Sequence, residues 1–312
     1  MPVFAKYARA ARQSERYIDG MNPASIVLYS AVAVAGIAFT VGAIRATRHY
    51  PNKRAPRLIE LIIGVVVNFF DALGIGSFAP TTALCKLLKL VPDEDIPGTL
   101  NAGLTATALL ECVIYVTAII VDPWLLLAMV VSAGAGAWIG AGVVARMPRR
   151  PIQIGMGIAL LIAGSVFVAI NLHLLPGGGD AMNLTGWRFG LAVTINFILG
   201  ALMGVGIGNY APCMVTLALL GMNPLAAFPI MMGSCALLQP IASLRFFETG
   251  RFGWGTCVGL SVGGIAGVLI AAYLVKSLPL VTLRWLVTFV IAYAAFAMLR
   301  SAATERRALA SA

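Results

Sequence analysis

Residues 74–80 read GIGSFAP and residues 206–212 read GIGNYAP, and each run interrupts a long apolar stretch. The two stretches, 58–91 and 190–221, are 34 and 32 residues long. As one straight helix either would measure about 50 Å, against a hydrocarbon core of about 30 Å. Glycine loosens a helix, and proline favours the first turn of a new one. Each stretch is therefore predicted to be a pair of half-helices that meet near mid-membrane in a hairpin.

The overall composition excludes a soluble protein. Of the 312 residues, 60% are hydrophobic and 11% are charged, and the mean hydropathy is +0.92. Soluble domains are about 45–50% apolar and about one quarter charged, so too few charged residues remain here to cover a soluble surface. A soluble enzyme, a secreted disulfide module and a disordered tail are excluded. The sequence predicts an all-α polytopic membrane protein.

The charged and metal-binding residue types point away from nucleic acid and from cofactors. The net charge is +10, but the basic residues cluster between apolar runs, where they orient helices and meet lipid headgroups. We therefore expect a lipid bilayer and no nucleic acid as partner. The five cysteines form no CxxC pair and the two histidines lie in connecting segments, so we expect neither a metal site nor a cofactor.

Besides the two hairpins, the chain contains apolar segments that read as complete spans. Residues 1–22 are basic and amphipathic, which predicts an interfacial segment before a retained first span. The predicted spans lie near 24–44, 98–121, 124–145, 152–171, 225–244, 253–275 and 282–300.

The two halves of the chain are repeats of one another. Adding 132 to a residue number maps seven Gly, Ile, Ala and Pro positions of the first half onto identical residues of the second, namely 74, 75, 76, 79, 80, 92 and 97. Each repeat would hold one broken-helix hairpin and three spans. The predicted organisation is an interfacial segment (1–22), a first span with its loop (23–57), repeat 1 (58–171), an inter-repeat loop (172–189), repeat 2 (190–300) and a tail (301–312).

The distribution of basic residues predicts the orientation. If both hairpins leave the membrane on the side where they began, one face holds 13 Lys and Arg, in residues 45–57, 146–150, 245–251 and the tail after 299. The opposite loops hold Arg188, Lys276 and Arg284. The richer face is expected to be cytoplasmic. Because each repeat has an odd number of spans, the second repeat should be inverted relative to the first.

Paired breaks in corresponding positions of two repeats indicate a transporter's substrate site. The second half-helix of each hairpin begins near mid-membrane, where its free N–H groups and positive dipole end favour an anion. Hydroxyl and amide side chains near the breaks and on the following spans would add donors without a fixed cation. The alternative is that the glycines only permit close helix packing. The candidate substrate-binding residues are Gly74, Ile75, Gly76, Ser77, Thr81, Asn101, Thr105, Gly206, Gly208, Asn209, Ser234 and Gln239.

The run NFFDALGIGSFAPTT at Asn68–Thr82, the second GIG motif and about eight or nine spans in two halves resemble the sulfite exporter TauE/SafE permease family. The likeness covers residues 58–300. It implies secondary transport of a small sulfur-containing or organic anion, such as sulfite or sulfoacetate, across the bacterial inner membrane. It also implies that Gly74, Gly76, Gly206 and Gly208 lie in the substrate region. Ser77 and Asn209 stand where many members continue in glycine, which affects the choice of substrate rather than the class.

Three charged residues inside apolar segments are candidates for coupling transport to protons: Asp71, Glu111 and Lys86. A lone carboxylate at the bilayer centre costs at least about 2.5–3.5 kcal/mol, so it needs a partner, a proton or water. A buried carboxyl that exchanges a proton could carry the coupling ion, and Lys86 could attract the anion. Alternatively, Asp71 caps a half-helix or pairs with Lys86, and Glu111 bonds a nearby Ser or Thr.

The sequence therefore predicts a permease that moves a small anion by alternating access, with protons as a possible coupling ion. An intramembrane enzyme would need a metal pair or a catalytic dyad, and no such motif occurs, so we expect no enzyme. A passive anion channel and a membrane assembly partner without transport would share the same sequence features. The oligomeric state cannot be derived from the sequence.

Overall fold

The computed structural model describes residues 23–49, 54–118, 121–172, 174, 179–203 and 208–274, together with positions 296, 299, 300 and 303. Residues 1–22, most of the predicted last span and of the tail, and Gly206 lie outside the described residues. The helices are α2 (Pro23–His49), α3 (Leu58–Ala72), α4 (Phe78–Leu87), η2 (Asp93–Asp95), α5 (Ile96–Ala118), α6 (Pro123–Val144), α7 (Arg149–Asn171), α8 (Gly186–Met203), α9 (Tyr210–Leu219), α10 (Pro224–Thr249) and α11 (Trp254–Leu274).

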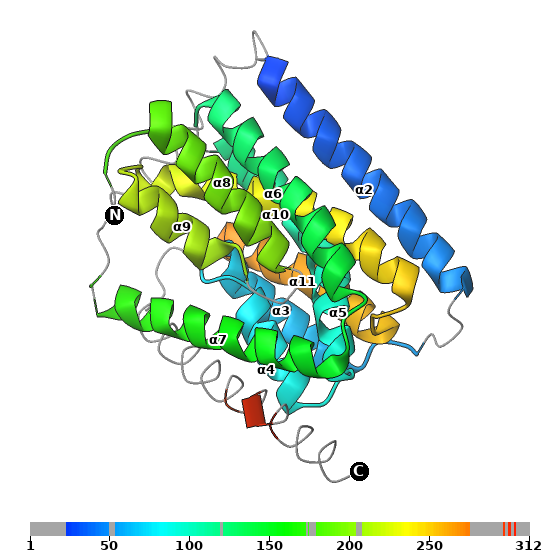
Figure 1. The fold of residues 1–312 in the computed structure, drawn as a ribbon. Coiled ribbons are helices and arrows are strands. Elements are labelled where there is room, and N and C mark those ends of the chain that lie inside the picture. Colours follow the sequence, from blue (N-terminus) through cyan, green and yellow to red (C-terminus); the bar gives the residue numbers. More distant parts are fainter. Residues whose placement is uncertain are drawn as a thin grey trace.

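The fold is a bundle of helices, as the composition predicts (Figure 1). Within the described part of the chain, six helices are long and apolar enough to cross a membrane: α2, α5, α6, α8, α10 and α11. The protein is thus a multi-pass membrane protein. In the interior α10 packs against both α5 and α6, whereas α2 lies along the outside of the bundle beside α10 (Figure 1).

The first apolar stretch breaks where its glycines are. Helix α3 ends at Ala72 and α4 begins at Phe78. Between them Gly74 and Gly76 have φ values of 84° and 90°, a left-handed conformation that favours glycine. The predicted pair of half-helices is therefore present in this stretch. The two ends of the hairpin lie close together. Leu90 and Val91, which follow α4, line the same pocket as Arg54, which precedes α3.

The second stretch is helical on both sides of its motif, and residues 204–207 lie outside the described residues. Helix α8 ends at Met203 and α9 begins at Tyr210. The Arg188 guanidinium, at the start of α8, donates to the Leu220 carbonyl, just after α9, at 3.4 Å. A short backbone bridge between Ala181 and Met222 adds to this closure. Both hairpins thus return to the side on which they began. Helix α8, with 18 residues and a length of about 27 Å, is longer than a half-helix needs to be.

Helices of the two halves are paired crosswise. Helix α3 packs on α11, and α8 packs on α6, so the first arm of each hairpin lies against a helix of the opposite half. Glycines make both contacts close. A methyl group on Gly267 of α11 would collide with the Val65 carbonyl of α3, and one on Gly136 of α6 would collide with the Phe197 carbonyl of α8. The two contacts correspond under the repeat offset, to within one residue. The inverted relation of the repeats stays a prediction.

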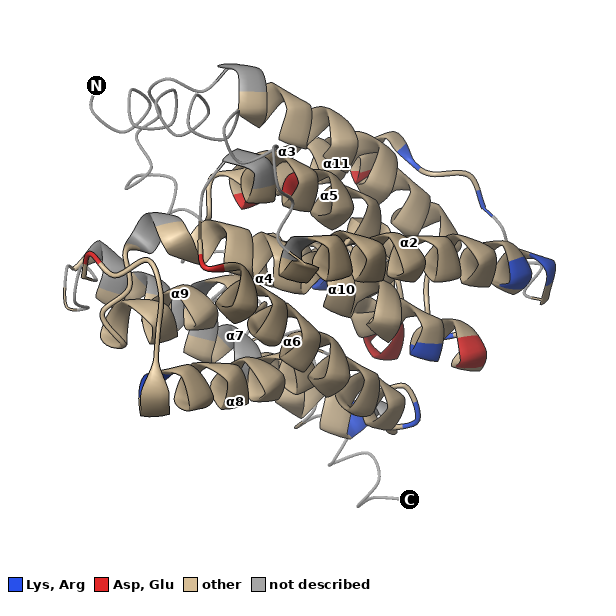
Figure 2. Cartoon of the chain, turned by 90° about the horizontal axis from the view of Figure 1, so that it is seen from above, with Lys and Arg blue, Asp and Glu red and all other residues tan. Residues whose placement is uncertain are grey.

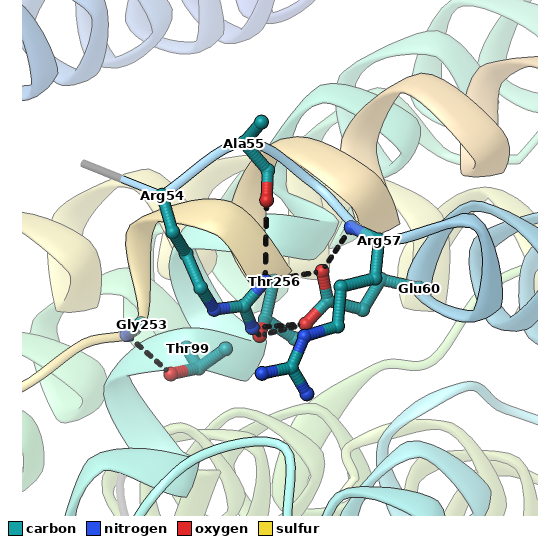
Figure 3. A network of polar contacts seen from close by, with 7 residues as sticks. All are labelled: Arg54, Ala55, Arg57, Glu60, Thr99, Gly253 and Thr256. Atoms are coloured by element: carbon teal, nitrogen blue, oxygen red, sulfur yellow. Dashed lines mark hydrogen bonds and ion pairs between the residues drawn. The ribbon is translucent and has the colours of Figure 1, made fainter.

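A polar network fixes the entrance to α3 (Figure 3). The fully buried Glu60 carboxylate accepts hydrogen bonds from the Arg54 guanidinium, from the Thr256 hydroxyl at 2.7 Å and from the Arg57 backbone N–H at 2.8 Å. Glu60 is the third residue of α3, so its carboxylate also lies at the favourable end of the helix dipole. This network holds the start of α3 against the start of α11.

The charged residues mark two different ends of the bundle. Figure 2 shows most of the described Lys and Arg in loops and helix ends, gathered toward the end where α2 and α10 finish. At the other end, the first turn of α8 carries Arg188. This agrees with the charge asymmetry on which the predicted orientation rests, and the assignment of that end to the cytoplasm stays a prediction.

Candidate anion site at the motif tips

The two broken-helix motifs meet each other inside the protein. We call residues 73–77 the first tip and residues 208–209, the described part of the second break, the second tip. A methyl group on Gly76 would lie 3.4 Å from Cβ of Tyr210, and one on Gly208 would lie 3.2 Å from Cβ of Phe78. Gly208 and Tyr210 are the repeat equivalents of Gly76 and Phe78, so the two contacts are reciprocal. The N-terminal ends of α4 and α9 therefore come together.

The first tip is closed around a carboxylate. The Ser77 hydroxyl, at the N-terminal end of α4, donates to Asp71 Oδ2 at 2.7 Å, and both side chains are buried. Asp71 lies in the last turn of α3, so the bond joins the two arms of the hairpin. The Tyr115 hydroxyl of α5 donates to the Ala72 carbonyl beside it. Ile75 is also buried, and it fills the turn with apolar volume.

The second tip carries an amide that makes no bond. Asn209 precedes α9, is fully buried and makes no side-chain capping bond to the helix. Neither Oδ1 nor Nδ2 of Asn209 has a hydrogen-bond partner in the described structure. Thr82, on α4, likewise has a buried hydroxyl without a partner among the described atoms. Unpaired buried polar atoms cost free energy, so such atoms in a native structure suggest water or a ligand.

A second carboxyl group lies between the halves. The Tyr210 hydroxyl donates to Glu111 Oε2 at 2.9 Å and also contacts the Met232 sulfur. Glu111, on α5, is fully buried. Its partner is thus a tyrosine of the second motif, and not the neighbouring Ser or Thr that the sequence offered as the alternative. Two acidic groups therefore flank the tips.

Several predicted donors lie further along the helices. The side chain of Asn101 donates to the Pro97 carbonyl at 2.8 Å, and the Thr105 hydroxyl to the Asn101 carbonyl at 2.7 Å. Asn101 precedes Glu111 by ten residues, or about 15 Å along α5, so it does not lie at the level of the tips. The structure therefore divides the predicted set into a tip group and a group nearer the helix ends.

Two of the three remaining candidates are hydrogen-bonded to other parts of the protein. The Thr81 hydroxyl donates to the Ser77 carbonyl at 2.7 Å, within α4. The Ser234 hydroxyl, on α10, accepts a hydrogen bond from the Asn196 side chain at 3.0 Å. Gln239 is also on α10 and buried, and its Oε1 has no partner in the part of the chain that is described.

Lys86 takes part in a different cluster. Its ammonium group forms an ion pair with Asp93, which also accepts a hydrogen bond from the Gln153 side chain at 2.8 Å. Lys86 is therefore not the partner of Asp71, which corrects the pairing considered from the sequence. The cluster joins the end of α4 to η2 and α7, away from the tips. In the described ranges, no group of three or more His, Cys, Asp or Glu side chains is arranged to hold a metal ion.

Sequence reasoning missed the two tyrosines at this site. Tyr210 stands within the GIGNYAP run, where the first motif has Phe78, and the extra hydroxyl was the available signal. Tyr115 carries no comparable signal, because its bond to the Ala72 carbonyl depends on how α5 packs against the first hairpin.

Comparison with known proteins gives one match. No curated protein and no solved structure is detectably similar to the chain. A family model does match, over a segment that includes α2 to α6, most of α7, the first tip, Asp71 and Glu111. Residues 17–167 match the family described as sulfite exporter TauE/SafE, which confirms the family expected from the motif at Asn68–Thr82.

Proposed function

We propose that the protein is a secondary transporter that moves a small sulfur-containing anion, sulfite or an organosulfonate such as sulfoacetate, across the bacterial inner membrane by alternating access. The matched family consists of membrane transporters of sulfur anions rather than enzymes. The observation that carries the proposal is that each tip contacts the first residue of the opposite half-helix, Gly76 with Tyr210 and Gly208 with Phe78. It brings two helix N-termini from the two halves to one place.

The groups at the tips favour reversible binding of an anion, as a transporter requires. The N-terminal end of a helix presents free N–H groups and a positive dipole end. Residues 71–82 and 208–216 contain no Lys or Arg, so the tips would hold an anion by neutral donors alone. A site without a fixed cation binds an anion weakly enough to release it on the other side of the membrane.

The closed state of the tips supports alternating access over a passive channel. Ser77, Asn209 and Tyr210 are all at most 5% exposed. A conducting channel needs a continuous wet path, whereas a carrier occludes its site between openings. Asp71 and Glu111 flank this occluded site, so we include protons as the coupling ion. Each carboxyl could take up a proton when the site faces one side and release it on the other.

Uptake by purified protein in lipid vesicles tests this function. Wild-type protein should take up labelled sulfite or sulfoacetate with saturable kinetics, and an inward proton gradient should stimulate uptake. Gly76→Leu and Gly208→Leu should abolish uptake, because either side chain would separate the tips. Gly190→Leu is the matched control, since a Cβ at Gly190 would meet no atom within 4 Å outside the neighbouring backbone of its own helix.

Three results would contradict the proposal. Normal uptake by either tip variant would mean that the tips are not the site. Ohmic, non-saturating currents would indicate a channel. Absence of flux for every sulfur anion tested, by wild-type protein that is monodisperse and folded, would favour an assembly role.

A further inference from the structure

The two tips correspond in sequence but differ in what they hold. We propose that the transported anion binds at the N-terminus of α9 through Asn209, because the equivalent place at the N-terminus of α4 is already filled by the protein's own carboxylate, Asp71. The proposal rests on the transport function above and specifies which tip binds the substrate and which form of the substrate it takes.

At the first tip the negatively charged group belongs to the protein itself, as the side chain of Asp71. Asp71 Oδ2 accepts the Ser77 hydroxyl hydrogen bond at 2.7 Å, at the N-terminal end of α4, and the side chains of both residues are buried. A carboxylate in this position is stabilised by the helix dipole and by the donor, in the same way as a bound anion would be. The positive end of α4 is thus already offset by the chain itself.

At the second tip the same place has no carboxylate. The repeat offset of 132 carries Ser77 to Asn209 and Asp71 to Met203. Met203 is fully buried, and its thioether carries no charge and accepts hydrogen bonds only weakly. Helix α9 therefore has the geometry of α4 without its internal anion.

The unpaired amide of Asn209 is independent evidence for a ligand at this end. Asn209 is fully buried, and both polar atoms of its side chain are without partners in the described structure. The hydroxyl of the repeat equivalent Ser77 donates to Asp71, whereas the Asn209 side chain has no such partner among the described atoms. An anion at this position would accept a hydrogen bond from Nδ2 and would meet the free N–H groups that begin α9.

The surrounding groups favour an anion with a single charge. Glu111 bonds Tyr210, the first residue of α9, and Asp71 bonds Ser77 at the facing tip, so an ionised form of either carboxyl group would repel a second negative charge on the ligand. An oxyanion that keeps one proton can also donate to Asn209 Oδ1, and it then satisfies both atoms of the amide. Hydrogen sulfite meets this description, whereas sulfate meets neither condition.

Kinetic comparison of the two tips tests the proposal. Asn209→Ala should raise the KM for sulfite by at least about tenfold, the effect of losing a hydrogen bond to a charged group. Ser77→Ala should lower the maximal rate, because Ser77 holds Asp71, while KM stays within about twofold of wild type. Thr194→Ala, at an exposed hydroxyl that bonds the Gly190 carbonyl, is the control for substitution on the same hairpin. Equal increases of KM for Asn209→Ala and Ser77→Ala would overturn the proposal.

A binding measurement separates this proposal from the transport function. In purified protein, sulfite at a pH where hydrogen sulfite dominates should raise the melting temperature of wild type and of Ser77→Ala. Asn209→Asp, which places a carboxylate at the second tip, should remain folded and monodisperse, but its melting temperature should no longer respond to sulfite. A full response in Asn209→Asp, or none in wild type, would mean that the Asn209 amide binds water only. Failure of vesicle uptake with this binding pattern intact would contradict the transport function and leave the binding site supported.

Discussion

The Tyr210 hydroxyl donates to Glu111 Oε2 at 2.9 Å, and this bond joins the second motif to a helix of the first half. The Cβ of the same tyrosine packs against Gly76 of the first motif, and its hydroxyl contacts Met232 of α10. Tyr210 thus contacts three separate elements where the two halves meet. A relative movement of the halves has to change this bond, and the bond is stronger when Glu111 is ionised than when it holds a proton.

Tyr210→Phe removes this hydrogen bond and leaves the ring in place. We expect sulfite uptake in vesicles to fall about tenfold, which is the scale of a hydrogen bond to a charged group. Uptake should also depend less steeply on pH, because the variant lacks the hydrogen bond whose strength changes when Glu111 gains or loses a proton. Tyr29→Phe, on the peripheral helix α2, is the matched control and should transport normally. Equal uptake by the two variants would remove Tyr210 from the mechanism.

Asp71→Asn tests proton coupling at the first tip. Asparagine keeps an acceptor for the Ser77 hydroxyl but cannot take up a proton. Acidification of the outside should therefore stimulate uptake by wild type and have little effect on the variant. Asp180→Asn, at an exposed loop position, should behave as wild type. A pH profile of Asp71→Asn that superimposes on that of wild type would exclude Asp71 as the proton carrier.

The glycine contact between α6 and α8 should be sensitive to a single methyl group. Gly136→Ala would press its Cβ against the Phe197 carbonyl, and overpacking of this kind costs about 1–3 kcal/mol. The melting temperature in detergent should fall by several degrees. Gly190→Ala lies on α8 with no atom within 4 Å of its Cβ, so it should be neutral or slightly stabilising. Equal melting temperatures for the two variants would show that α6 and α8 can move apart at this contact without a loss of stability.

The network at the entrance to α3 should respond to loss of its cation. The Glu60 side chain is 0% exposed and that of Arg54 is 32% exposed, so Arg54→Ala leaves a buried carboxylate without its charged partner. We expect a loss of about 1–3 kcal/mol in the free energy of unfolding. The double variant Arg54→Ala/Glu60→Gln should recover part of this loss, because glutamine carries no charge.

A surface ion pair provides the comparison for this network. Glu248 pairs with Arg245 at 3.0 Å, and the Glu248 side chain is 49% exposed. Glu248→Gln should therefore change stability by less than about 1 kcal/mol. If it destabilises as much as Arg54→Ala, burial is not the cause of the effect at Glu60.

The sequence predicted the helix breaks because they depend on local chemistry. Gly74 and Gly76 adopt left-handed φ values that glycine favours, and the proline of each motif lies in the first turn of the new helix. The family followed from the same local run. The helices α2, α5, α6, α7, α10 and α11 agree with the corresponding predicted spans to within five residues at each end, while the predicted span 282–300 lies mostly outside the described residues.

The polar partners depended on the fold and were less predictable. Glu111 and Tyr210 are 99 positions apart, and no periodicity relates α5 to α9. The sequence also could not show which predicted donors lie near the tips. Asn101 is in the same helix bundle as the tips but at a different depth along α5. The pair of Lys86 with Asp93 is only seven positions apart, and the acidic residues after α4 offered a signal for it.

The crosswise pairing of α3 with α11 and of α8 with α6 has a consequence for biosynthesis. Ribosomes deliver α3 long before α11, so the first hairpin enters the bilayer without the glycine-lined groove that later receives it. Neither half can make these contacts alone, and a fragment ending after α7 would lack the α8 helix that covers Gly136 of α6. Two separately expressed halves should therefore accumulate only when they are made in the same cell, each acting as the scaffold on which the other is assembled.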